Sequence, residues 1–128
     1  MSKERRVLRE LLAFLNALEV VILFFMDSEI LYDEDLGYLK SKLKELSTCK
    51  KEGCIDNLND LIDFIRRLRG FLFGEEREIA EEDLFKAEKL LNKLRKLENM
   101  EHIEKTIQSF AIALFSEIED ADDAKQCS

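Results

Sequence analysis

One histidine is the residue of this chain best suited to acid–base chemistry near neutral pH, because an imidazole titrates in that range. It is His102, and the chain of 128 residues has no other histidine. Arg95 precedes it by seven positions, so a guanidinium that could stabilise phosphate charge accompanies a group that could move a proton. A lone histidine in a chain with 38% charged residues is most often a solvated surface residue, and that interpretation stays open.

The spacing of Arg95 and His102 resembles the arginine–histidine pair of HEPN-type ribonucleases, small all-α proteins in which the pair lies at a dimer groove. The resemblance implies metal-independent RNA cleavage, with His102 as acid and base for attack by a ribose 2′-hydroxyl and Arg95 stabilising the phosphate. In that family the residue after the arginine is commonly Asn, Asp or His, whereas Lys96 follows here. The resemblance therefore covers two residues.

Two acidic pairs, Glu101 with Glu104 and Glu117 with Asp120, resemble the Glu-x-x-Glu and Glu-x-x-Asp pairs of all-α nucleotide pyrophosphatases. Those enzymes bring the pairs together across two helices to bind magnesium. Here residues 105–116 read as one helical stripe without a turn, so a rise of 1.5 Å per residue keeps the pairs roughly 24 Å apart. We therefore predict no metal site from them.

The three cysteines, Cys49, Cys54 and Cys127, are too few and too unevenly placed for the framework of a small secreted protein, which favours a cytosolic setting. A disulfide between Cys49 and Cys54 is possible, with free thiols as the alternative. It would be unexceptional in a hyperthermophile, and the abundance of Lys and Glu is typical of proteins from hot environments. With His102 the thiols also supply zinc-ligand types, but two ligands would have to converge from remote segments. We predict no cofactor.

Four lysines form a stripe of one sign on a predicted helix over residues 79–97. They are Lys86, Lys89, Lys93 and Lys96, and they fall within a sector about 80° wide. Glu82 lies near the first, but the other three have no acidic residue four positions before them. The stripe either meets water or acidic residues of another helix, or it docks an acidic protein or a short nucleic-acid backbone.

Helices must position these residues, because the chain has no proline, only four glycines and many strong helix formers. The apolar periodicity predicts five helices, over about 2–26, 33–46, 55–73, 79–97 and 100–118. Asp33 and Asn99 are plausible N-caps, although one helix over 79–119 is an alternative. We predict an all-α, antiparallel up-and-down bundle over 1–119, with four long helices and one shorter, and an acidic disordered tail over 120–128.

The first predicted helix is apolar nearly all round. One flank is needed for the core, which leaves Ala13, Ala17, Val20 and Phe24 on the opposite flank. A helix of this kind is either central in the bundle or at a dimer interface, and we predict that these four residues form the interface. Its uninterrupted apolar run, residues 20–26, is seven residues long where a membrane span needs about twenty, so no span is predicted.

A net charge of −8 argues against binding duplex nucleic acid, which requires excess Lys and Arg. The chain contains no phosphate-binding loop or nucleophile motif. We therefore predict a cytoplasmic, homodimeric interaction module without catalytic activity: a scaffold, adaptor or assembly component for an unknown protein partner. Such modules occur among small proteins of archaea and their viruses. The alternatives are a ribonuclease using Arg95 and His102, or a nucleic-acid backbone binder using the lysine stripe.

Overall fold

The computed structural model describes residues 3–127, and the side chains of residues 3–124. Five α-helices account for most of these residues: α1 Lys3–Asp27, α2 Asp33–Ser47, α3 Glu52–Leu68, α4 Gly74–Arg95 and α5 Glu101–Cys127. A short 3-10 turn, Arg69–Phe71, follows α3. The described residues contain no β-strand, so the predicted all-α class is confirmed.

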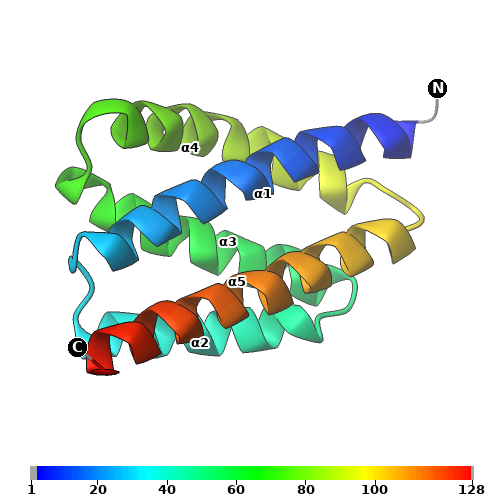
Figure 1. The fold of residues 1–128 in the computed structure, drawn as a ribbon. Helices are drawn as coiled ribbons and strands as arrows, with labels where there is room; N and C mark the ends of the chain where they lie inside the picture. The colour runs from blue at the N-terminus through cyan, green and yellow to red at the C-terminus, as the bar shows by residue number, and fades with distance from the viewer. Residues whose placement is uncertain (1–2, 128) are drawn as a thin grey trace.

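The helices form a ring around one core. Figure 1 shows the chain crossing the molecule from side to side, with each helix running opposite to the one before it. Around the ring, α1 packs against α4, α4 against α3, α3 against α2, α2 against α5, and α5 against α1. The first and last helices run in the same direction and close the ring. The two main neighbours of α1 are therefore α4 and α5, helices that are distant from it in sequence.

The core consists of the inward stripes of all five helices. Its largest fully buried side chains include Phe25 of α1, Leu43 of α2 and Phe64 of α3, although Phe64 retains slightly more exposure than the other two. The outer flank of α1 is not covered, since Leu12 and Val20 are each 46% exposed. The alternative that the first helix lies at the centre of the bundle is therefore wrong.

The helix ends on either side of the α3–α4 connection differ from the sequence prediction. Helix α3 ends at Leu68 and passes into the 3-10 turn, and α4 begins at Gly74 instead of Ile79. Gly74 has a φ of +65°, which a glycine adopts without strain and which lets the chain reverse. Glu75 and Glu76 then occupy the first turn of α4, where the helix dipole favours negative charge.

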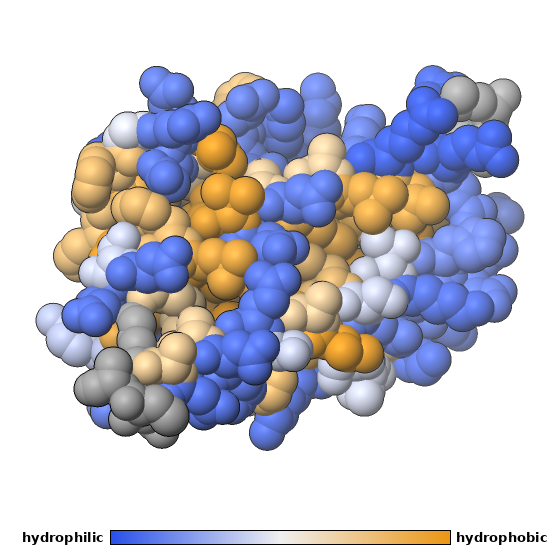
Figure 2. Space-filling model, in the orientation of Figure 1, coloured by the Kyte–Doolittle hydropathy of each residue, from blue (hydrophilic) through white to orange (hydrophobic). Residues whose placement is uncertain are grey.

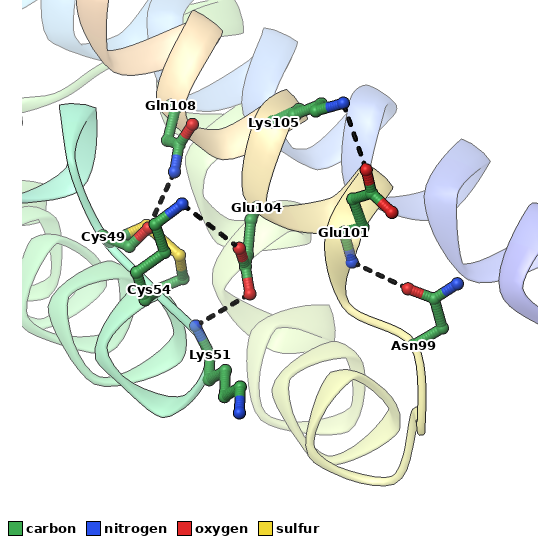
Figure 3. A network of polar contacts seen from close by, with 9 residues as sticks. Cys49, Lys51, Cys54, Asn99, Glu101, Glu104, Lys105 and Gln108 are labelled. Atoms are coloured by element: carbon green, nitrogen blue, oxygen red, sulfur yellow. Dashed lines mark hydrogen bonds and ion pairs between the residues drawn. A yellow bond between two sulfur atoms is a disulfide. The ribbon is translucent and has the colours of Figure 1, made fainter.

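The break between the last two helices is present, so the single long helix over 79–119 is wrong. Helix α4 ends at Arg95 and α5 begins at Glu101. The Oδ1 atom of Asn99 accepts a hydrogen bond of 3.0 Å from the backbone N–H of Glu101 (Figure 3). Asn99 thus satisfies one of the donors that the start of a helix leaves unpaired.

The predicted disordered tail is wrong over residues 120–127, because α5 continues to Cys127. Glu119, just before this segment, and Asp122, within it, share a basic partner on α2. The Nζ atom of Lys40 lies 3.2 Å from Glu119 and 3.1 Å from Asp122. Ala121 also packs against the core. Together these contacts hold the last turns on the bundle, an arrangement that the local composition of 120–128 does not reveal.

The connection between α2 and α3 is cross-linked and tied to α5. The Sγ atoms of Cys49 and Cys54 form a disulfide, which leaves neither thiolate for the zinc site considered above. The Nε2 of Gln108 donates to the backbone oxygen of Cys49 at 2.7 Å, and the backbone N–H of Lys51 donates to Glu104 Oε1 at 3.1 Å (Figure 3). The side chain of Cys127 lies outside the described residues.

Replacing both Cys49 and Cys54 with alanine is expected to lower the free energy of unfolding by roughly 2 kcal/mol, because the disulfide closes a short loop and restricts the unfolded chain only modestly. Urea unfolding under non-reducing conditions measures the difference. In a reducing buffer the wild type and the double variant should unfold at the same urea concentration. An unchanged midpoint without reductant would contradict the prediction.

Candidate functional site

A groove of about 500 Å³ lies between α1 and α4. Its apolar lining comes from both helices: Ala13, Phe14 and Ala17 of α1, and Ile79 and Leu90 of α4. Ala13 and Ala17 are four residues apart, so they lie on the same face of α1, one turn from each other. Because alanine side chains are short, they do not fill the space between α1 and α4, and the groove stays open there.

Lysines form the rim of this groove on the α4 side. Lys86, Lys89 and Lys93 all line it, whereas Lys96 follows the end of α4 and does not. The Nζ of Lys93 lies 2.9 Å from Glu10 of α1, and the Nζ of Lys86 lies 2.9 Å from Glu82. Lys89 forms no ion pair with the residues described. The lysine stripe is therefore partly compensated, by a residue of α1 that sequence spacing alone could not identify.

A buried carboxyl group also lines the groove. Asp83 is only 8% exposed, and its Oδ2 atom has no hydrogen-bond partner among the described residues. Burial raises the pKa of this carboxyl from 3.8 to about 7, Lys86 opposes the rise, and Glu82 adds to it. Sequence reasoning missed Asp83. The available signal was its position between Ala80 and Leu84 in the apolar sector of the helix.

The four residues predicted for an interface lie along one exposed flank of α1. Ala13 is exposed and Ala17 half-buried, and both line the groove. Val20 is 46% exposed. Phe24 is half-buried, and its ring meets the edge of the Phe73 ring at a centroid distance of 5.8 Å.

The exposed apolar surface extends beyond these four residues. Figure 2 shows hydrophobic residues gathered in the middle of the face where α1 and α5 lie. Leu12 of α1 and Ile112 of α5 contribute to the exposed apolar area, at 46% and 59% exposure. The flank that we predicted to need a partner is therefore not enclosed by the chain itself.

The residues of the ribonuclease resemblance have separate partners. The Nη1 of Arg95, at the end of α4, lies 3.4 Å from Asn92 Oδ1. The Nδ1 of His102, in the first turn of α5, lies 3.3 Å from Glu4 of α1, and the imidazole is largely exposed. Arg95 borders the hollow at the α4–α5 connection, and His102 faces α1. The polar partners of the two residues are therefore different.

The acidic pairs of the second resemblance are two ends of one helical segment. Glu101 and Glu104 lie in the first turn of α5, and Glu117 lies four turns further along. The described residues contain no group of three or more His, Cys, Asp or Glu side chains arranged to hold a metal ion. Glu117 instead approaches Glu19 of α1, and burial together with Glu117 raises the pKa of Glu19.

Comparison with protein-family models, curated proteins and solved structures found no match to this chain. Among the described helices, none combines the length and hydropathy that a membrane crossing requires. The features of the chain that bear on its function are therefore the groove, its lysine rim and the uncovered flank of α1.

Proposed function

We propose that this protein is a protein–protein interaction module and that the groove between α1 and α4 docks an acidic, amphipathic helix. In this role it serves as a scaffold, adaptor or assembly component in the cytoplasm, working as a homodimer and not as a catalyst. The observation that carries the proposal is the combination of an apolar groove floor with a lysine rim along one edge. An amphipathic helix with acidic flanks matches both features.

The chemistry of the groove suits a helix better than it suits a compact charged ligand. Apolar side chains that enter it can each contribute about 1.5–3 kcal/mol by leaving water. The lysines add orientation and a faster encounter more than they add affinity, because they lie at a solvated rim. The half-buried Ala17 and exposed Ala13 let a helix backbone approach α1 closely.

RNA cleavage has less support, since Arg95 and His102 lie on different helices and are held by different partners. Binding along a nucleic-acid backbone also has less support. The chain carries a net charge of −8, and the floor of the groove is apolar, which suits an amphipathic helix better than a phosphate backbone.

A synthetic helical peptide tests the docking proposal. The peptide carries Leu at every third or fourth position and Glu on both flanks of that stripe, and its binding is followed by fluorescence anisotropy. We expect binding that weakens as salt rises. The Ala17→Arg variant, which fills the groove, and the Lys86→Glu/Lys89→Glu variant should each bind at least about tenfold more weakly.

Lys105→Glu is the matched control, because Lys105 is an exposed lysine of α5 outside the groove. It should bind the peptide as the wild type does. Equal affinity for the wild type and both groove variants would show that the groove is not the docking site.

A further inference from the structure

The charges of α4 are segregated along its length. One stripe of the helix is acidic in the first half and basic in the second: Glu75, Glu78 and Glu82, then Lys89, Lys93 and Lys96. At 100° per residue these six positions fall within a sector about 60° wide. We call them the α4 stripe. Its members Glu75, Glu78, Lys89 and Lys96 form no ion pair with any residue that the structure describes.

A large apolar side chain lies at the middle of this helix. Phe85 is 88% exposed, and charged members of the stripe lie on either side of it along the helix. Covering such an exposed phenylalanine ring with a partner is energetically favourable. Its position halfway along the α4 stripe places the apolar contact where the sign of the charge reverses.

The α4 stripe is complementary to itself when two copies run in opposite directions. If Glu82 lies opposite Lys89 of a second copy, then Glu78 lies opposite its Lys93 and Glu75 opposite its Lys96. This follows because the spacing from Glu82 back to Glu75 is the same as the spacing from Lys89 on to Lys96: four residues and then three. Symmetry repeats each pair. In the same register the two Phe85 residues lie about 1.5 Å apart along the axis, beside the two-fold. A parallel arrangement would instead place like charges together.

Phe85 lies on the side of α4 away from the groove. It borders a hollow together with Arg66, near the end of α3, and Arg69, in the 3-10 turn, and it is not among the residues that line the groove. A two-fold axis keeps equivalent residues on one side of the interface, so both Phe85 rings lie on the side remote from the groove.

We infer that the protein forms a two-fold dimer in which α4 helices of two copies pack antiparallel along the α4 stripe, with Phe85 of each copy beside the two-fold axis. This inference rests on the homodimer of the proposed function and names its interface. Two residues break the charge order, Arg77 in the acidic half and Glu88 in the basic half. Both lie more than about 100° from the middle of the stripe, on the flank that faces away from the groove.

Charge exchange between two variants tests the dimer. The first variant is Glu75→Lys/Glu82→Lys, whose stripe is basic except for Glu78, and the second is Lys89→Glu/Lys96→Glu, whose stripe is acidic except for Lys93. Sedimentation should give a dimer mass for the wild type and a monomer mass for each variant alone, with self-affinity weakened roughly 100-fold. An equimolar mixture should regain the dimer mass, because every opposed pair is again complementary. Circular dichroism checks that each variant is folded.

Glu101→Lys/Lys105→Glu is the matched control, since it exchanges an exposed ion pair of α5 outside the stripe, and it should remain dimeric. A Phe85→Cys variant in a Cys127→Ser background should form an intermolecular disulfide at the two-fold, which tests the register independently. A monomeric wild type, a mixture that stays monomeric, or a dimer that both charge variants retain would overturn the inference. If the wild type is monomeric yet binds the acidic peptide, the groove still docks a helix, and that helix belongs to another protein.

Discussion

Raising the pH from 4 to 7 is expected to destabilise the fold through Asp83. Burial raises the pKa of this carboxyl to about 7, against 3.8 for the group in water. Between these values the folded state keeps the proton and the unfolded state has lost it, so the free energy of unfolding falls as the pH rises and levels off above 7. The pKa difference corresponds to at most about 4 kcal/mol.

The Asp83→Asn variant isolates this contribution, because an amide has nearly the same shape and does not titrate. Urea midpoints at pH 4.5, 6, 7.5 and 8.5, at one protein concentration, give the comparison. The variant should match the wild type near pH 4.5 and be more stable at pH 7.5. Glu19, whose pKa is also raised, contributes a slope of the same sign in both proteins. Parallel curves for the two proteins would contradict the prediction, because they would show that folding does not change the pKa of Asp83.

The helices themselves could be predicted from periodicity, since the inward stripes of α1, α2 and α5 repeat at three and four residues. The ends depended on features that periodicity does not contain. Helix α4 starts at Gly74 because of a positive φ and two glutamates in its first turn. The last turns of α5 form because Lys40 of α2 faces them, and only the folded chain brings that lysine near.

The candidate site could be predicted in its parts and not in its assembly. The lysine stripe and the alanine flank of α1 each stood out in the sequence, but nothing in the sequence placed them on the same groove. That juxtaposition depends on α1 packing against α4, a helix more than forty residues away in sequence. Lys93 and Glu10 pair for the same reason.

The helix predicted over residues 79–97 contains the basic half of the α4 stripe and only Glu82 of its acidic half. The acidic half carries Glu75 and Glu78, which precede the helix start predicted at Ile79. With α4 beginning at Gly74, both residues join the helix and the stripe acquires its negative end. The position of this helix start therefore decides whether the surface is basic or self-complementary.

The Phe25→Ala variant is expected to lose about 3–5 kcal/mol of unfolding free energy, because it removes a fully buried ring from the centre of the core and leaves a cavity. The sequence presents two apolar flanks on α1, and the structure places Phe25 on the enclosed one. Thermal and urea unfolding at one protein concentration measure the loss. Such a loss would leave little of the 5–15 kcal/mol that folded domains of this size have.

Val20→Ala is the matched control for this prediction, since Val20 lies on the other apolar flank of the same helix and is 46% exposed. Its removal should change the unfolding free energy of the monomer by less than about 1 kcal/mol. The two substitutions separate the flank that holds the bundle together from the flank that is left for a partner. Similar losses at both positions would mean that both flanks of α1 are enclosed in solution, and the docking surface would then have to lie elsewhere.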